Sequence, residues 1–274
     1  MVNVTKADGS KQPFERDKIV RTCMRMRLNK DDAQEVADRI ENKIYEGIST
    51  GQILKMIFTY TTGYRPAIKH QIDLREAICL LSPKPDFEKF VGLLLKAEGY
   101  DVKTNQIVRG RCIEHEIDAI ATKNNEKIYV EVKHHYQYHS FTGVDVFLET
   151  AAIFEDMDEA NNNFSKAMVI TNGKISEHAI RYAACKKIDA IGWRYPDGGS
   201  LESRIEKHRL YPITFIRGLN ADVKDRLGDN GIILLQQLVT YDAHRLSKIT
   251  KIGKSQVKEI LGKAEIILTN HKND

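Results

Sequence analysis

Two acids and a lysine near the middle of the chain have a spacing that could support phosphodiester chemistry. In EHEIDAIATKNNEKIYVEVKHH, residues 114–135, Asn124-Asn125 suits a two-residue hairpin turn because Asn tolerates positive φ. With that turn, Asp118 lies opposite Glu131, at the Cβ separation of about 5 Å that is typical of cross-strand neighbours. The strand period of two also places Lys133 on the face of Glu131. The sequence therefore predicts two carboxylates and an ammonium at one spot.

Such a cluster suits a divalent cation beside a phosphate. Two close carboxylates repel each other unless a cation neutralises them, and Mg²⁺ (or Mn²⁺) prefers oxygen ligands and is completed by water and substrate phosphate. Asp118 and Glu131 are the predicted metal ligands, with the main-chain carbonyl of Val132 as a third. Lys133 would orient the attacking water or offset charge in the transition state. The alternative is a solvated hairpin face with a cross-strand ion pair, against which the otherwise apolar strands and their flanking elements argue.

The elements around this hairpin predict a mixed sheet with helices on its faces. Residues 86–99 have helical spacing and end at Gly99, and Ser176 is placed to cap a later helix. Extended runs are expected near 100–108, 112–121, 128–134, 166–171 and 188–193, and helices near 143–160 and 175–187. The acids of the first of these helices, Asp145, Glu149, Glu155, Asp156, Asp158 and Glu159, are expected to form its solvated face.

The flanking segments are mostly helical by pattern. A short hairpin (Val2–Lys6 and Gln12–Phe14, turning at Asp8-Gly9) precedes helices predicted at 16–28, 31–47, 50–63 and 66–81, with Thr50 as an N-cap. SPKP, residues 82–85, ends this segment as the candidate linker. After residues 210–214 the pattern is all helical, with turns at Gly231 and Gly253. We expect a mixed α/β chain of three domains: 1–83, 84–212 and 213–274.

Composition excludes several classes of protein. The 274 residues contain no apolar run of the roughly 18 to 20 residues that cross a bilayer, and the start lacks an apolar signal-peptide core. The four cysteines are scattered without metal-binding spacing, so we expect small buried residues of a reducing, cytoplasmic protein and no structural zinc. Residues 86–212 have more acids than bases, whereas both flanks are basic. This distribution suits a cation-binding centre whose neighbours attract a polyanion.

The central segment, from Asp86 to about Thr214, resembles the Mrr-like branch of the PD-(D/E)xK restriction endonucleases. The resemblance lies in Phe87-Glu88, Gly99-Tyr100, Ile117-Asp118, Val130-Glu131-Val132-Lys133, Val169-Ile170-Thr171-Asn172 and Gly192-Trp193. It implies that Asp118 and Glu131 bind the metal, that Lys133 is the catalytic lysine, and that Glu88 is an accessory acid. A surface glutamate in the first turn of a helix is the alternative for Glu88. His134, His135 and His139 follow the lysine as either phosphate-contacting groups or ordinary loop residues.

Residues 2–81 resemble an ATP-cone, the regulatory module of ribonucleotide reductases and their transcriptional repressor. The signature is Val4-x-Lys6-x-Asp8-Gly9, Phe14, Lys18-Ile19 and Ser49-Thr50. By that resemblance Lys6 and Lys18 would hold the phosphates of ATP or dATP, with Thr50 as a further contact. A compact ammonium on a long stem suits this role. The chain has no Walker-type glycine-rich loop, so we expect nucleotide sensing and no ATP-driven motor.

The last segment resembles tandem helix-hairpin-helix motifs, which grip duplex backbone without reading sequence. Lys248, Lys251, Lys254 and Lys258 cluster around the Lys251-Ile252-Gly253-Lys254 turn and are the predicted phosphate contacts. A protein-interaction bundle with a basic solvated face is the alternative.

Together these features predict a Mg²⁺-dependent, type IV restriction-like endonuclease of double-stranded DNA, regulated by ATP or dATP and assembled as a dimer or larger homo-oligomer. The alternative from another class is a nucleotide-responsive DNA-binding regulator that retains the nuclease fold only as a scaffold. An RNA nuclease would use the same three residues.

Overall fold

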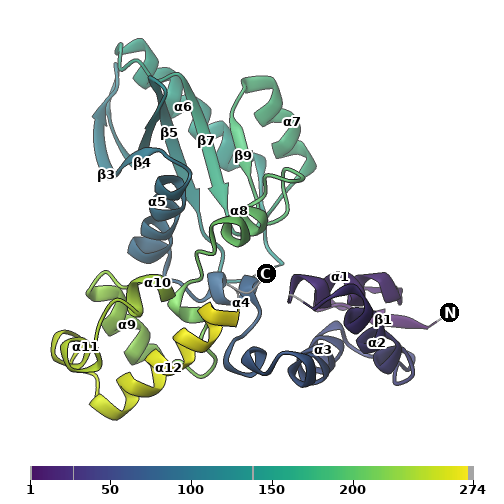
Figure 1. Cartoon of the computed structure of the whole chain (residues 1–274). Helices are drawn as coiled ribbons and strands as arrows, with labels where there is room; N and C mark the ends of the chain where they lie inside the picture. The colour runs from purple at the N-terminus through teal and green to yellow at the C-terminus, as the bar shows by residue number, and fades with distance from the viewer. Residues whose placement is uncertain (1, 27, 138, 271–274) are drawn as a thin grey trace. The chain divides into compact units, whose positions relative to one another are not determined.

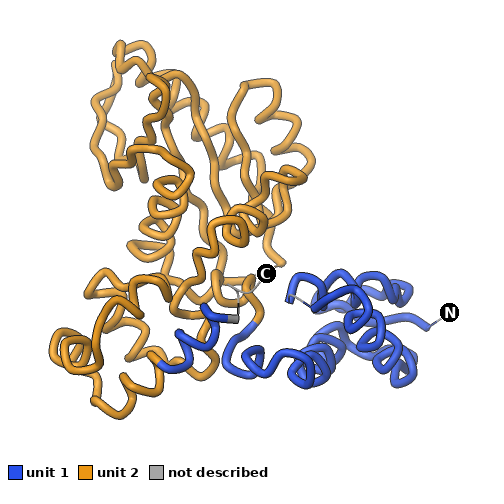
Figure 2. Tube along the Cα trace, viewed as in Figure 1, with its two compact units in different colours: residues 1–72, 262–274 blue, residues 73–261 orange. Residues whose placement is uncertain are grey.

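The computed structural model describes residues 2–26, 28–137 and 139–270. The chain divides into two compact units, one of residues 1–72 with 262–274 and one of residues 73–261 (Figure 2). The predicted mixed α/β class is confirmed, because a central mixed sheet carries helices and the C-terminal segment is helical (Figure 1). No helix within the described residues is both long and apolar enough to cross a bilayer.

The first unit is a small helical bundle with a β-hairpin. Strands β1 (Asn3–Thr5) and β2 (Lys11–Pro13) pair antiparallel, and Gly9 supplies the positive φ of 81° in their turn. The apolar faces of the helices meet in a core that includes Val4, Ile19 and Ile40. The helices are α1 (Arg16–Arg25), α2 (Lys30–Glu41), α3 (Thr50–Tyr64) and the 3₁₀ turn η1 (Pro66–His70).

Three sequence predictions for this segment are wrong in detail. The N-cap of α3 is Ser49 and not Thr50, because the Ser49 hydroxyl accepts the Gln52 N–H while the Gln52 side chain accepts the Ser49 N–H. The helix expected over 31–47 ends at residue 41. The helix expected over 66–81 divides, because the Asp73 carboxylate accepts backbone N–H groups and starts a new helix, α4 (Leu74–Cys79).

The second unit is built on a five-stranded sheet of order β3-β4-β5-β7-β9. The first three strands form an antiparallel meander, and β7 and β9 then extend the sheet in parallel from β5. The parallel pairs bring the carboxyl ends of β5 and β7 to one edge, which is where ligands bind in sheets of this kind. The strands are β3 (Asp101–Arg109), β4 (Glu114–Lys123), β5 (Glu126–Lys133), β7 (Lys166–Thr171) and β9 (Asp189–Ile191).

Helices cover this sheet because each has one apolar face. Helix α5 (Glu88–Ala97) buries Phe90, Val91 and Leu94 and packs on β3 and β4. Helices α6 (Val144–Glu159) and α7 (Glu177–Lys186) share a core with Tyr129 of β5, and the predicted Ser176 cap of α7 is confirmed. The remaining elements are the helical turn η2 (Pro83–Phe87), the two-residue strands β6 (Phe141–Thr142) and β8 (Lys174–Ile175), and α8 (Leu201–His208), which the sequence pattern did not predict.

The C-terminal segment is helical as predicted, with turns near Gly231 and Gly253. Its first expected hairpin is reduced, since α10 has only four residues. Its elements are η3 (Ile213–Phe215), α9 (Ala221–Asp229), α10 (Leu235–Leu238), α11 (Ala243–Thr250) and α12 (Lys254–Asn270). The prediction of four buried cysteines is half wrong, because Cys112 and Cys185 are exposed. Residue type alone did not distinguish these loop and helix-surface positions from the core.

Candidate active site

The hairpin between β4 and β5 has the turn and register that its sequence indicates. Asn124 and Asn125 have φ values of 51° and 64°, as a tight two-residue turn requires. Ala119 pairs with Val130 and Ile120 with Tyr129, which is the predicted register. This register brings Asp118 and Glu131 to the same end of the hairpin.

Strands β4 and β5 separate where the acids stand. The β4–β5 pairing ends at Ala119, and β5 continues along β7 to Lys133. Beyond that point the Asp118 Oδ2 accepts the Val132 N–H at 2.8 Å, in place of a main-chain partner. Because the N–H and C=O of one strand residue point to the same edge, the Val132 carbonyl also faces the Asp118 side. The separation therefore gathers carboxylate and carbonyl oxygens in one place.

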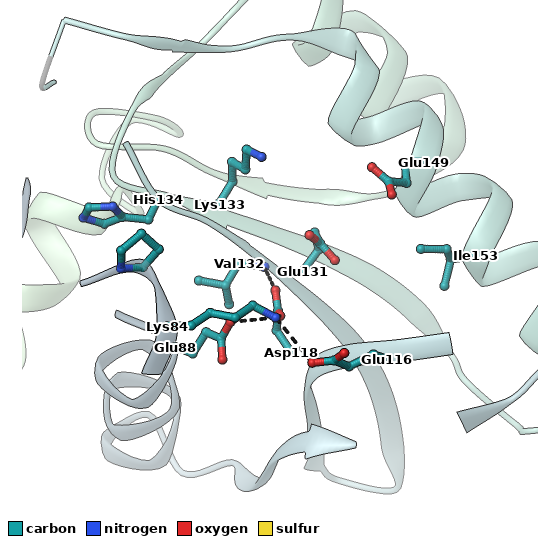
Figure 3. Close-up of a pocket in the computed structure, with 11 residues that line it drawn as sticks. Lys84, Glu88, Glu116, Asp118, Glu131, Val132, Lys133, His134, Glu149 and Ile153 are labelled. Atoms are coloured by element: carbon teal, nitrogen blue, oxygen red, sulfur yellow. Dashed lines mark hydrogen bonds and ion pairs between the residues drawn. The ribbon is translucent and has the colours of Figure 1, made fainter. Parts of the chain in front are cut away.

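A cavity of about 310 Å³ lies over this point. Figure 3 shows Asp118, Glu131 and Lys133 around it, with Lys84 and Glu88 on one side and Glu149 of α6 on another. Its lining comprises Pro83, Lys84, Glu88, Glu116, Asp118, Glu131, Val132, Lys133, His134, Glu149 and Ile153. The structure thus brings all four predicted catalytic residues, and the Val132 backbone, to one cavity.

The surroundings of Glu131 disfavour its bare carboxylate and favour either the neutral acid or a cation bound nearby. Its pKa is raised to about 7, mainly by burial and then by the neighbouring Asp118 charge. The Tyr129 hydroxyl opposes this by donating a hydrogen bond to Glu131 Oε2 at 2.8 Å. An acid with this environment is typical of a functional site.

Glu88 is a buried acid and not the surface helix glutamate that was its alternative. Its side chain is only 4% exposed, and its Oε2 is buried and has no hydrogen-bond partner among the residues that the structure describes. Burial and then Asp118 raise the pKa of Glu88, although Lys84 lowers it. A buried, half-satisfied carboxylate beside Asp118 is costly for the fold unless a cation or proton offsets it.

Lys84 is a member of the site that the sequence did not indicate. Its Nζ lies 3.2 Å from Glu88 Oε1, 3.4 Å from Asp118 Oδ1 and 3.5 Å from Glu116 Oε1. Burial lowers the pKa of Lys84, but the three carboxylates outweigh it and hold the pKa above its ordinary value. The residue stands in SPKP, which reads as a linker, so no local signal identified it.

The donors present fit a hard divalent cation with few protein ligands. Among the described residues, no three His, Cys, Asp or Glu side chains are arranged to enclose a metal ion by themselves. Mg²⁺ needs no such cage, because one or two carboxylates with water and substrate phosphate complete its shell. Asp118, Glu131 and the Val132 carbonyl supply that number of ligands, and Glu88 adds a third carboxylate beside Asp118.

Two acids of α6 depart from the predicted solvated face. Glu149 is exposed but lines the cavity, and its charge contributes to the raised pKa of Glu131. Asp156 is mostly buried and holds the β3–β4 connection, where it accepts the Cys112 N–H at 2.8 Å and contacts His115 Nε2 at 2.7 Å. The helical period could not predict that Glu149 lies near Glu131 or that Asp156 contacts His115, because both partners lie on strands far away in the sequence.

Two of the three histidines after Lys133, His134 and His135, make contacts at the end of β5. His134 Nε2 lies 3.2 Å from the Ile78 carbonyl, and its ring packs against Phe87. His135 donates its N–H to Asn172 Oδ1 at 2.7 Å and contacts Thr142 Oγ1. Burial lowers the pKa of both imidazoles, which favours their neutral forms at physiological pH.

In the first unit, two of the three predicted nucleotide contacts stand beside each other. Thr5 donates its N–H to the Ile48 carbonyl at 2.9 Å and forms an isolated parallel β-bridge with Ser49. The residues that follow each of them, Lys6 and Thr50, are therefore neighbours at the start of α3. Helix α3 begins at this point with its N–H groups. Lys18 lies in the first turn of α1, where its Nζ pairs with Glu15 at 2.6 Å.

The predicted DNA contacts are all exposed around one turn. Helix α11 ends at Thr250 and is capped by Lys251, whose φ is 57°, and α12 begins at Lys254. Ile252 between them is buried, which anchors the turn, and Ser247 donates to its carbonyl. Lys248 and Lys258 flank the turn on the two helices. The arrangement leaves four ammonium groups and a helix N-terminus facing solvent.

Comparison with known proteins agrees with the order of these parts. The ATP cone domain family matches residues 2–75, the family described as restriction endonuclease (Mrr catalytic) matches residues 81–192, and the family described as AF1548-like, C-terminal matches residues 211–268. An uncharacterized protein of Archaeoglobus fulgidus is 33% identical over 175 residues, which are 64% of this chain and 98% of that protein. The crystal structure of a protein of unknown function, AF1548, is similar with a TM-score of 0.60 and 32% identity, covering 66% of this chain and 96% of the other.

Proposed function

We propose that this chain, which belongs to the family of the Archaeoglobus fulgidus protein and joins an ATP cone to an Mrr-type restriction endonuclease domain, is a metal-dependent DNA endonuclease. One observation carries the proposal. Asp118, Glu131 and the Val132 carbonyl meet where β4 and β5 separate, and Lys133 follows on the same strand and lines the same cavity. A structural hairpin has no need of two partly buried acids beside an amine.

Each of these residues has a part in phosphodiester hydrolysis. Asp118 and Glu131 would hold Mg²⁺ or Mn²⁺ together with the Val132 carbonyl. The bound cation would lower the pKa of water and neutralise charge on the phosphate. Lys133 would orient the attacking water and offset the negative charge that develops on the phosphoryl oxygens. Glu88, beside Asp118, would act as the accessory acid that holds water or the cation's outer shell.

Double-stranded DNA would be held by its backbone. Lys248, Lys251, Lys254 and Lys258 surround the α11–α12 turn, and their ammonium groups suit phosphate contacts that carry no sequence information. We also propose that α11, the turn and α12 form a helix-hairpin-helix motif.

ATP or dATP would regulate cleavage through the ATP cone. Lys6, Lys18 and Thr50 are the proposed phosphate contacts, and we infer that nucleotide binding changes the state of a homo-oligomer and so gates the nuclease. Size-exclusion profiles with and without ATP or dATP test this idea, and superimposable profiles would argue against gating by assembly.

Cleavage of supercoiled plasmid in Mg²⁺ or Mn²⁺ tests the nuclease itself. Asp118→Ala and Lys133→Ala should each abolish nicking, whereas Asp101→Ala and Lys103→Ala, which change exposed residues of β3, should leave it intact. If wild type and variants bind DNA equally and none nicks it, the protein is a nucleotide-responsive DNA-binding regulator instead. An RNA substrate run in parallel separates a DNA nuclease from an RNA nuclease.

A further inference from the structure

The segment that enters the second unit is built into the nuclease site. Residues 73–87 follow directly after the boundary at Ile72. At the end of α4, the Ile78 carbonyl contacts His134, the residue after the candidate catalytic lysine. The next residue, Cys79, accepts a hydrogen bond from Asn172 Nδ2 at 3.4 Å. This segment therefore touches the carboxyl ends of both β5 and β7.

Further along this segment, Lys84 reaches into the cavity itself. Figure 3 shows its amine among Asp118, Glu88 and Glu116, and the three N···O distances are 3.2 to 3.5 Å. One ammonium thus contacts three carboxylates from two elements, at the start of α5 and at two positions of β4. Of these acids, Asp118 is also the first candidate metal ligand.

Of the charged groups in this cluster, the Lys84 ammonium is the one that can move away from the others. Its side chain is 60% exposed, whereas the Glu88 and Asp118 side chains are 4% and 10% exposed. The amine can swing into water with little loss of packing, but neither acid can follow it. The acids would then be left without a counter-charge, which is costly for partly buried carboxylates. Another cation or a proton must then offset their charge.

We propose that Lys84 is an active-site residue that competes with the divalent cation for Asp118 and Glu88, so that the metal binds as the lysine leaves. The inference rests on the proposed metal-dependent nuclease and adds the residue that controls loading of its site. Because Lys84 lies in the segment that begins at the unit boundary, a change in that segment's position alters how readily the cation binds.

Binding of Mn²⁺ to the full chain, without DNA or nucleotide, tests the proposal by electron paramagnetic resonance of the free ion. Lys84→Met keeps the length and apolar stem of the side chain but removes the charge. It should bind Mn²⁺ about tenfold more tightly than wild type, as expected for removing one nearby, partly screened positive charge. Lys96→Met, which removes an exposed charge near the C-terminal end of α5, should bind like wild type. Unchanged or weaker binding by Lys84→Met would overturn the proposal.

A measurement on the wild-type protein covers the case in which the variant folds poorly. Reductive methylation followed by mass spectrometry reports how accessible each lysine amine is. Addition of Mn²⁺ should speed methylation of Lys84 relative to Lys96, and an unchanged ratio would refute displacement. Asp118→Ala distinguishes failure of the proposed metal site from failure of the proposed role of Lys84. If wild type binds Mn²⁺ and Asp118→Ala does not, the metal site stands whatever Lys84 does. If the two bind alike, the proposed nuclease site fails and the role of Lys84 fails with it.

Discussion

Replacing Glu131 by Gln should stabilise the folded protein while it abolishes cleavage. The amide has nearly the shape of the carboxylate and can still accept the Tyr129 O–H. It carries no charge, so it neither repels Asp118 nor loses solvation of an ion on burial. The native carboxylate is retained at a cost to stability, as functional acids often are.

The size of this effect follows from the pKa of Glu131, which rises from 4.5 to about 7. A shift of that size corresponds to about 3 kcal/mol, since one pKa unit is worth about 1.4 kcal/mol. Its sign is fixed by linkage: the folded protein binds this proton more tightly than the unfolded chain, so wild-type stability falls as pH rises from about 4.5 to 7. We expect Glu131→Gln to be about 2 to 3 kcal/mol more stable at pH 8 and to lose that advantage near pH 4.5.

The single tryptophan makes the measurement specific to the second unit. Trp193 is the one Trp of the sequence and is buried, so its fluorescence reports urea unfolding of the unit that holds the site. Unfolding is followed in EDTA, because a bound cation would offset the charge of Glu131 and mask the difference. The same curves at pH 8 and near pH 4.5 give the pH dependence of the difference in unfolding free energy.

A matched control is Glu126→Gln, an exposed acid on the same strand, whose stability should follow that of wild type at both pH values. If Glu131→Gln is less stable than wild type at pH 8, or if its advantage does not change with pH, the charged Glu131 carboxylate does not destabilise the folded protein.

Three further outcomes are expected. Asp156→Asn should destabilise the second unit at pH 7, because the His115 side chain and the Cys112 N–H hold the pKa of Asp156 well below its usual range. This destabilisation should begin to shrink below about pH 4, the ordinary pKa of an aspartate, and should keep shrinking as pH falls toward the lowered pKa of the folded state. Lys6→Ala and Lys18→Ala should each weaken ATP binding about tenfold, as calorimetry would measure, through loss of a charged phosphate contact. Lys254→Ala should weaken DNA binding at every sequence and lower the salt slope by about one.

Each of these has its own control. Asp158→Asn changes an exposed acid of the same helix and should leave the acid sensitivity of unfolding intact. For nucleotide binding, Lys11→Ala removes an exposed lysine of the hairpin, and an equal loss of affinity in this variant would make the effect one of general charge. For DNA binding, Lys207→Ala removes an exposed lysine outside the α11–α12 turn and serves as the control. An unchanged salt slope for Lys254→Ala would show that the α11–α12 turn does not contact DNA phosphates.

Local patterns correctly predicted the hairpin that carries Asp118 and Glu131. Two asparagines that tolerate positive φ set its turn, and the strand period of two then set which residues face each other. Asp118 and Glu131 come to the same end of the hairpin for that reason, and hydrophobic periodicity likewise predicted the extended runs and helices of the mixed sheet. The order of the strands within the sheet was known only from the structure. The predicted domain boundaries, nucleotide contacts and DNA contacts stay predictions.

Tertiary structure decided what surrounds that hairpin. Lys84 and Glu88 reach Asp118 because α5 packs on β3 and β4, and Asp156 reaches His115 because α6 crosses the sheet. Helical and strand periods describe neighbours within a few residues, whereas these contacts join residues about 30 or more positions apart. The sequence by itself therefore determined the pair of acids, and only the packing of helices on the sheet decided that Lys84 and Glu88 stand beside Asp118.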